Sequence, residues 1–176
     1  MAFRESQLLP MVLKMVELEL MKLAEKAVEN LKQKNKTLAL AESCTGGWVS
    51  KLVTDISGAS AVYQGGVCSY SNEVKMKILG VKEETLASFG AVSEQVAVQM
   101  AEGVRKALNS DIGIGITGIA GPLSDNTAKP VGLIYVAIAD ETKTLCTELK
   151  NNFTEDIRLQ NRFSASKTAL NLLGEI

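Results

Sequence analysis

Apolar side chains recur at helical spacing in two segments of the chain. From residue 16 to 34, an apolar side chain returns every three or four positions, with Lys and Glu between. From Ser93 to Leu108 the apolar stripe consists of Val96, Met100, Val104 and Leu108. This period predicts two amphipathic helices, and Ser93 is the expected N-cap of the second one.

Short apolar runs bounded by turn residues predict the strands. They cover residues 37–41, 66–70, 111–117, 131–139 and 144–149. The turn at residues 140–143 predicts that the last run pairs antiparallel with the one before it. The strand at 111–117 alternates Ile with Gly.

Further helices are predicted between these strands. They cover about 45–55, then 72–79 with Asn72 as N-cap, 82–88, and 154–173 with Thr154 as N-cap. Strands that alternate with helices indicate an α/β fold: a three-layer α/β/α arrangement with a mixed, mostly parallel sheet and helices on both faces. We expect one domain over residues 16–176, preceded by an extension over 1–15 that either frays or continues the first helix.

Composition narrows the function classes. Hydrophobic residues make up 46% and charged residues 22% of the chain, which is typical of a globular protein. A net charge of −1 and an aromatic content of 5% argue against nucleic-acid partners. No apolar run is long enough to span a membrane and no signal-peptide pattern is present, so we expect a cytoplasmic protein without a membrane partner.

The chain contains no histidine, which excludes Ser-His-Asp and Cys-His mechanisms. It also removes the commonest zinc ligand, and no Cys-x-x-Cys pair replaces it. The odd number of cysteines indicates reduced thiols: Cys44, Cys68 and Cys146. Acid-base chemistry would fall to Lys, Tyr, Asp, Glu or an amine.

Ser43 follows the first predicted strand, where ligands sit in open α/β sheets. Gly46 and Gly47 allow close backbone approach, and the N–H groups of a helix start near Thr45 and Gly46 would suit an oxyanion. The simpler alternative is that Ser43 or Thr45 only caps the helix. The glycine pair is what that alternative explains least well, because two glycines in a helix start cost about 1–2 kcal/mol.

Lys75 is the best candidate for a base that activates Ser43. It would have to be neutral, which requires burial or neighbouring cations. Tyr70 could relay a proton or orient that amine. The alternatives are a solvated helix lysine and a strand aromatic. Cys44 is a poor nucleophile candidate, because without histidine it lacks its usual activating partner.

The loop after the strand at 111–117 and an arginine pair near the C-terminus each allow two interpretations. The loop after the strand at 111–117 begins with Thr117 and Gly118, and it either lines a pocket or is a plain turn. The Gly-x-G-x-x-G match at 113–118 lies inside the strand, so it does not indicate a dinucleotide site. Arg158 and Arg162 share a helix face and would hold a phosphate, or they form a solvated face.

Five motifs in order resemble one known family, the C-terminal domain of competence/damage-inducible protein CinA. They are Ala-Glu-Ser-Cys-Thr-Gly-Gly at 41–47, Tyr-Ser-Asn at 70–72 with Lys75, Gly-Ala-Val-Ser at 90–93, Thr-Gly-Ile-Ala-Gly-Pro at 117–122 and Lys-Pro-Val-Gly at 129–132. The resemblance spans roughly residues 16 to 175.

The resemblance implies hydrolysis of the carboxamide of nicotinamide mononucleotide to nicotinic acid mononucleotide and ammonia, without metal or cofactor. It implies Ser43 as nucleophile, Lys75 as base, Tyr70 as assistant and Thr117 at the substrate or oxyanion. The other residues expected at the substrate or oxyanion are Glu42, Thr45, Gly46, Gly47, Asn72, Gly118, Arg158 and Arg162. It also implies a homodimer or higher homo-oligomer.

The chain departs from the family pattern in two places. The segment before Arg158 carries one residue more than the family spacing, and the loop at 123–127 lacks the usual Gly-Gly. A second function class is therefore kept beside the amidohydrolase: a non-catalytic nucleotide- or phosphate-binding module built on the same glycine turn and arginines. A role in DNA competence is suggested only by the family's name.

Overall fold

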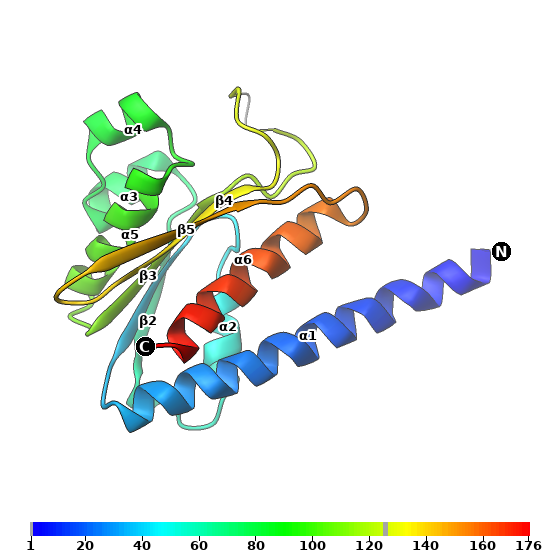
Figure 1. Cartoon of the computed structure of the whole chain (residues 1–176), viewed down its shortest axis with the longest axis horizontal. Coiled ribbons are helices and arrows are strands. Elements are labelled where there is room, and N and C mark those ends of the chain that lie inside the picture. Colours follow the sequence, from blue (N-terminus) through cyan, green and yellow to red (C-terminus); the bar gives the residue numbers. More distant parts are fainter. Residues whose placement is uncertain (1, 125–126) are drawn as a thin grey trace.

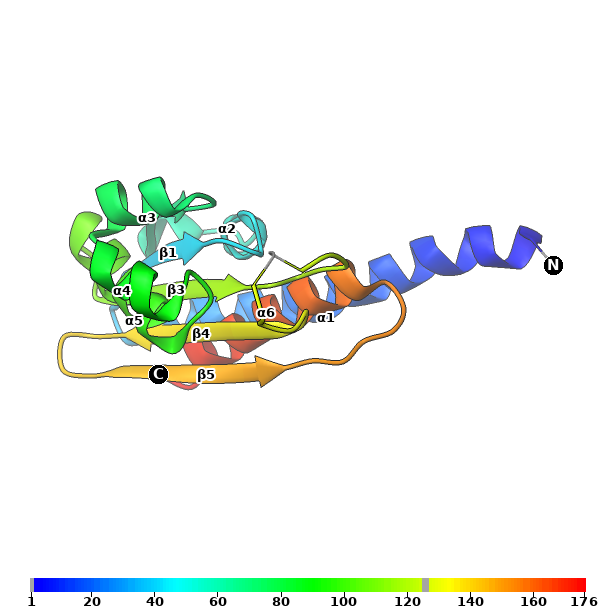
Figure 2. The same cartoon turned by 90° about the horizontal axis from the view of Figure 1, so that it is seen from above.

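A five-stranded mixed sheet forms the centre of the computed structural model, which describes residues 2–124 and 127–176, with side chains from residue 14 onward (Figure 1). The strand order is β2-β1-β3-β4-β5. Their bounds are β1 Leu38–Glu42, β2 Tyr63–Cys68, β3 Ile112–Gly118, β4 Leu133–Ala139 and β5 Thr144–Lys150. β2, β1 and β3 are parallel, whereas β4 and β5 add an antiparallel hairpin at one edge (Figure 2).

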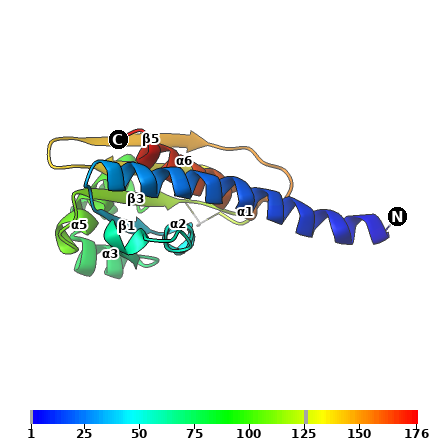
Figure 3. The ribbon, with the colours of Figure 1, turned by 90° about the horizontal axis from the view of Figure 1, so that it is seen from below.

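Helices cover both faces of the sheet, so the predicted three-layer α/β/α fold is confirmed. One face carries α1 Ala2–Gln33, α2 Trp48–Thr54 and α6 Ile157–Gly174; the other carries α3 Asn72–Leu79, α4 Glu83–Phe89 and α5 Glu94–Ala107. A short 3-10 turn spans Ala59–Ala61. The N-terminal part of α1 runs past the body of the protein (Figure 3). In the described part of the chain, no helix is both long and apolar enough to cross a membrane.

Alternating side chains of β1 and β3 build two cores. Leu38, Leu40 and Ile114 are fully buried on the α1/α6 side. On the other side the glycines of β3 let α5 approach: a Cβ at Gly113 would lie 2.1 Å from the Ala101 carbonyl oxygen. The Ile-Gly alternation thus serves helix packing, in agreement with its rejection as a dinucleotide motif.

The helix after β1 begins later than predicted and has another cap. Residues 43–47 form a turn, and the N-cap is Gly47 at φ 91°, without a side-chain capping bond of its own. Ser43 and Thr45 are therefore not the cap. The left-handed conformation is accessible to glycine at little cost, and this explains Gly47.

Other predicted boundaries shift by one to three residues. The second strand begins at Tyr63 instead of Gly66. Ser71, and not Asn72, caps α3 by accepting from the Val74 amide. The N-cap of α6 is Asp156 at φ 44°, so Thr154 is not the cap. The Ser93 cap and the antiparallel β4–β5 pair are confirmed.

Candidate active site

The turn that carries Ser43 is fixed to the sheet at the carboxyl end of β1. The Ser43 amide donates to the Ile116 carbonyl of β3 at 3.0 Å, and the Gly46 amide donates to the Ser43 carbonyl at 3.1 Å. On the other side of β1, the Ser69 amide donates to the Glu42 carbonyl at 2.8 Å. Ser43 therefore sits at the strand end that the sequence indicated for a ligand.

The Lys75 amine lies beside the Ser43 hydroxyl. Its Nζ is 3.2 Å from Ser43 Oγ, although the two residues come from different elements. Lys75 is 1% exposed, and burial lowers the pKa of its amine from the ordinary value of 10.5. Among the described residues no carboxylate forms an ion pair with this amine. Both conditions favour the neutral form that a base needs.

A backbone carbonyl, which sequence reasoning missed, orients this amine. Lys75 Nζ donates a hydrogen bond to the Ser69 carbonyl oxygen. The hydroxyl of Tyr70, expected at the amine, instead accepts from Arg158 at 3.4 Å. Tyr70 is 66% exposed. A carbonyl at the end of β2 leaves no side-chain signal in a sequence, so only the fold could reveal it.

These groups open into a pocket of about 280 Å³ at the carboxyl end of the parallel strands. Seven predicted site residues line it: Ser43, Tyr70, Asn72, Lys75, Thr117, Gly118 and Arg158. Seven further residues complete the described lining alongside Cys44: Ala91, Val92, Ile119, Ala120, Gly121, Leu123 and Ser124. Residues 125 and 126 of the departing loop lie outside the described residues.

Another part of the pocket wall is tied together by polar contacts. Thr117 Oγ1 donates to the Ala91 carbonyl at 2.8 Å. Lys129 Nζ donates to the carbonyls of Phe89 and Val92, which clamps the α4–α5 connection to the loop after β3. The loop at 117–122 is thus a pocket wall rather than a plain turn.

Five of the expected substrate-binding residues do not line this pocket. The Glu42 carboxylate is 1% exposed and accepts from the start of α2. Gly47 supplies one of those donors, and the Gly46 amide is used in the turn. These bonds occupy the Glu42 carboxylate and the Gly46 and Gly47 amides within the protein, and direct substrate contacts by these three residues stay a prediction.

Arg162 is also occupied by the protein. Its guanidinium donates to the Thr45 carbonyl at 2.8 Å and lies over the Trp48 ring at 5.2 Å. The two arginines of α6 therefore differ: Arg158 reaches the pocket, where it donates to the Gly121 carbonyl at 3.1 Å, while Arg162 fastens α2 to α6. Thr45 is fully buried, and its amide has no partner among the described residues.

The thiol next to Ser43 is unsuited to attack. Cys44 is buried, and this burial raises the pKa of its thiol to about 12. A thiol is a weak nucleophile unless it ionises. All three cysteines are free, as expected.

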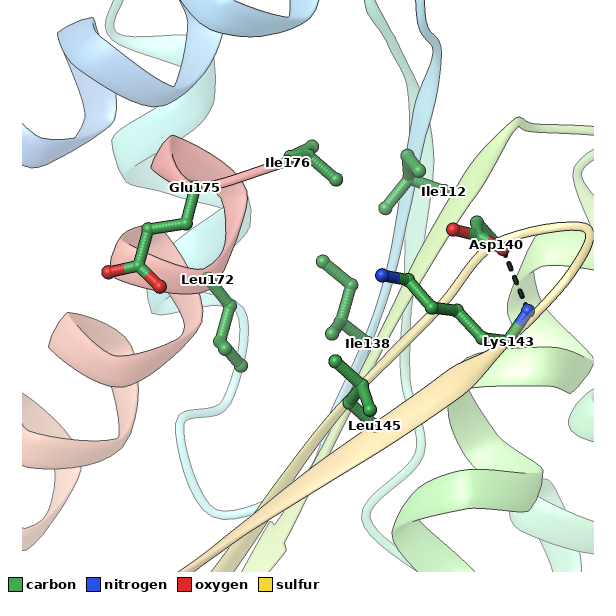
Figure 4. A pocket seen from close by; sticks show the side chains of 8 residues that line it. All are labelled: Ile112, Ile138, Asp140, Lys143, Leu145, Leu172, Glu175 and Ile176. Atoms are coloured by element: carbon green, nitrogen blue, oxygen red, sulfur yellow. Dashed lines mark hydrogen bonds between the residues drawn. The ribbon is translucent and has the colours of Figure 1, made fainter.

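A different pocket, of about 140 Å³, lies at the other end of the sheet (Figure 4). Ile112, Ile138 and Leu145 from the strands face Leu172 and Ile176 at the end of α6. Its Asp140 side chain accepts from the Lys143 amide of the same turn at 2.9 Å. Its lining offers no hydroxyl, thiol or buried amine for catalysis.

Comparison with known proteins identifies the family. The family model of the CinA C-terminal domain matches residues 20–176. Nicotinamide-nucleotide amidohydrolase PncC of Escherichia coli is 50% identical over 125 residues, covering 71% of this chain and 76% of that protein. A CinA-like protein of Endomicrobium trichonymphae is 48% identical over 151 residues, covering 86% of this chain and 35% of that protein. The chain spans only 30–36% of the length of several such curated relatives.

Solved structures agree. Competence/damage inducible protein CihA of Agrobacterium tumefaciens is 36% identical, with a TM-score of 0.82 over 88% of this chain and 93% of that one. A competence-damaged protein (CinA) superfamily protein of Klebsiella pneumoniae is 31% identical, with a TM-score of 0.83 over 89% of this chain and 96% of that one. By sequence and by fold, this chain belongs to the CinA C-terminal domain family.

Proposed function

We propose that the chain hydrolyses the carboxamide of nicotinamide mononucleotide to nicotinic acid mononucleotide and ammonia, with Ser43 as nucleophile and Lys75 as base. The observation that carries this proposal is the buried Lys75 amine at 3.2 Å from Ser43 Oγ. The 50% identity to a nicotinamide-nucleotide amidohydrolase supports the substrate.

The geometry suits a neutral amine. Such an amine has two N–H donors and one lone pair, so it can donate to the Ser69 carbonyl and accept the Ser43 proton. As the proton moves to Lys75 Nζ, Ser43 Oγ bonds to the carboxamide carbon. The C–N bond then breaks, and Lys75 returns the proton to the departing ammonia. Water, deprotonated by the same amine, hydrolyses the ester on Ser43.

The remaining polar groups of the pocket are assigned to binding. The positive guanidinium of Arg158 keeps donors free beside its bonds to Gly121 and Tyr70, and we assign it to the substrate phosphate. Of the N–H groups considered for the oxyanion, those of Gly46 and Gly47 are occupied. Thr45 is fully buried and does not line the pocket, so its amide is not available to an oxyanion there either.

The test is ammonia release from nicotinamide mononucleotide by the purified chain, combined with calorimetry. The wild type should turn over, and Ser43→Ala should lose at least about 10³-fold in kcat while its melting temperature stays close to that of the wild type. Binding without ammonia release by the wild type would instead favour the non-catalytic nucleotide-binding module. Undiminished turnover by the folded Ser43→Ala protein would contradict the assignment of the nucleophile.

A further inference from the structure

The Glu42 side chain makes four hydrogen bonds to the start of α2. Its Oε2 accepts from the Gly47 and Val49 amides, both at 3.1 Å. Its Oε1 accepts from the Ser50 amide at 2.8 Å and from Ser50 Oγ at 2.7 Å. The residue is 1% exposed, so a carboxylate here depends on these donors to replace water.

The hydrogen bonds continue outward to β2. Tyr63, the first residue of that strand, donates from its hydroxyl to Ser50 Oγ at 2.8 Å. The Ser50 hydroxyl in turn donates to the Glu42 carboxylate. The three side chains therefore form a row of hydrogen bonds that all donate toward Glu42. Gly66 leaves room for it, because a Cβ there would lie 2.6 Å from the Tyr63 hydroxyl and 2.8 Å from Ser50 Oγ.

This chain of bonds closes a loop around Ser43. The backbone of Glu42 belongs to β1 and fixes one side of Ser43, while its carboxylate holds the helix that follows. The Gly46 amide bridges the turn between them. A change in the carboxylate would therefore release the α2 end of the five-residue turn at 43–47, while backbone bonds still hold its β1 end.

We propose that Glu42, supported by Ser50 and Tyr63, is a positioning residue that sets Ser43 Oγ against the Lys75 amine. The inference rests on the proposed amidohydrolase function. A hydroxyl displaced by about 1 Å from its reacting geometry costs roughly 10²-fold in rate. Glu42 touches no reacting atom and acts through the backbone of the turn.

Three substitutions remove progressively fewer hydrogen bonds of this network, and we expect progressively smaller losses of kcat. Glu42→Gln should lower kcat about 30- to 100-fold with KM nearly unchanged, because one carboxamide cannot accept from all four donors. Ser50→Ala keeps the backbone bonds to Glu42 and should lose about 3- to 10-fold in kcat. Tyr63→Phe removes only the outermost bond and should lose about 2- to 3-fold.

A matched control lies on β4. The Tyr135 hydroxyl donates to Glu148 Oε1 at 2.6 Å on an exposed part of the hairpin. Tyr135→Phe removes the same kind of group and should leave kcat unchanged. Measured well below the melting temperature of each variant, the kcat losses should persist in fully folded protein, whereas a merely structural role predicts wild-type kcat there.

Hydrogen exchange separates this proposal from the proposed function. In Glu42→Gln the amides of Gly47, Val49 and Ser50 should exchange at least about tenfold faster than in the wild type, whatever the substrate. A wild type that releases no ammonia would refute the function and leave this exchange test standing. Unchanged exchange of these amides, or wild-type kcat in both Glu42→Gln and Ser50→Ala, would overturn the positioning role.

Discussion

The two ends of the sheet both carry hollows, and the larger one lacks the features of a catalytic site. At the end opposite Ser43, a hollow of about 560 Å³ is lined by Lys34, Lys36, Arg105, Asp111 and Asp140 among others. At the carboxyl end of the parallel strands the pocket is half that volume, about 280 Å³. Size and charge therefore do not identify the site; the state of the polar groups does.

At the far end the carboxylates are already satisfied by their own surroundings. Asp111 accepts from the Thr37 amide and hydroxyl, both at 2.8 Å, and lies 3.7 Å from the Lys36 amine. At the Ser43 end, a buried amine faces a hydroxyl without a carboxylate partner among the described residues. An unpaired, desolvated base beside a nucleophile therefore distinguishes the reactive end of the sheet from the far end.

Removing the base should have the largest effect on activity of all the substitutions considered. Lys75→Met should lower kcat about 10²- to 10⁴-fold, since general-base catalysis contributes that much. Lys75→Arg keeps a cationic side-chain type but places a permanently protonated group there, so it should lose as much. Steady-state ammonia release checks both. A Lys75→Arg enzyme near wild-type activity would mean that charge, and not proton transfer, is what the site requires.

The dependence of activity on pH tests the same assignment of Lys75 as the base. Burial lowers the pKa of the Lys75 amine, and the base works only when deprotonated. Activity should therefore rise with pH through an apparent pKa below the ordinary 10.5, as measured by kcat/KM across pH. A rate that is flat with pH, or that falls over that range in the folded enzyme, would contradict the assignment.

Substitutions of the two arginines of α6 should have different effects, one on substrate binding and the other on stability. Arg158→Ala should lower kcat/KM about 10- to 100-fold, mainly through KM, because a charge-assisted contact to the substrate is lost. Arg162→Ala loses its bond to the Thr45 carbonyl and its contact with Trp48, so the melting temperature should fall more than in Arg158→Ala. Steady-state kinetics and thermal unfolding measure the two effects. Equal changes of KM in both variants would contradict the separate roles of Arg158 and Arg162.

The smallest effect is expected at the far end. Asp111→Asn should cost about 1 kcal/mol of unfolding free energy and leave kcat unchanged. Its hydrogen bonds to Thr37 lower the pKa of the carboxyl below the ordinary 3.8. Its stabilising contribution is therefore present above that value and is lost as pH falls through the lowered pKa. Denaturant unfolding at several pH values measures this, and a loss of kcat would connect the far end to catalysis.

The sequence predicts the three layers and the antiparallel pairing of the last two strands better than it predicts helix starts. Periodicity locates the apolar faces, but α2 starts at a left-handed Gly47, with its first amides held by the distant Glu42 carboxylate. Local patterns do not reveal this start. The absence of histidine and the family motifs together predict that Lys75 acts on Ser43. The Ser69 carbonyl and the role of Arg162 depend on contacts between distant segments, which no local pattern encodes.

The most direct test of the account is to locate the acyl group formed during turnover. The wild type is mixed with nicotinamide mononucleotide, quenched in acid within the first turnover, digested and analysed by tandem mass spectrometry. The account predicts an ester of nicotinic acid mononucleotide on Ser43. An adduct on Cys44, or rapid ammonia release with no acylated peptide at any time point, would contradict it.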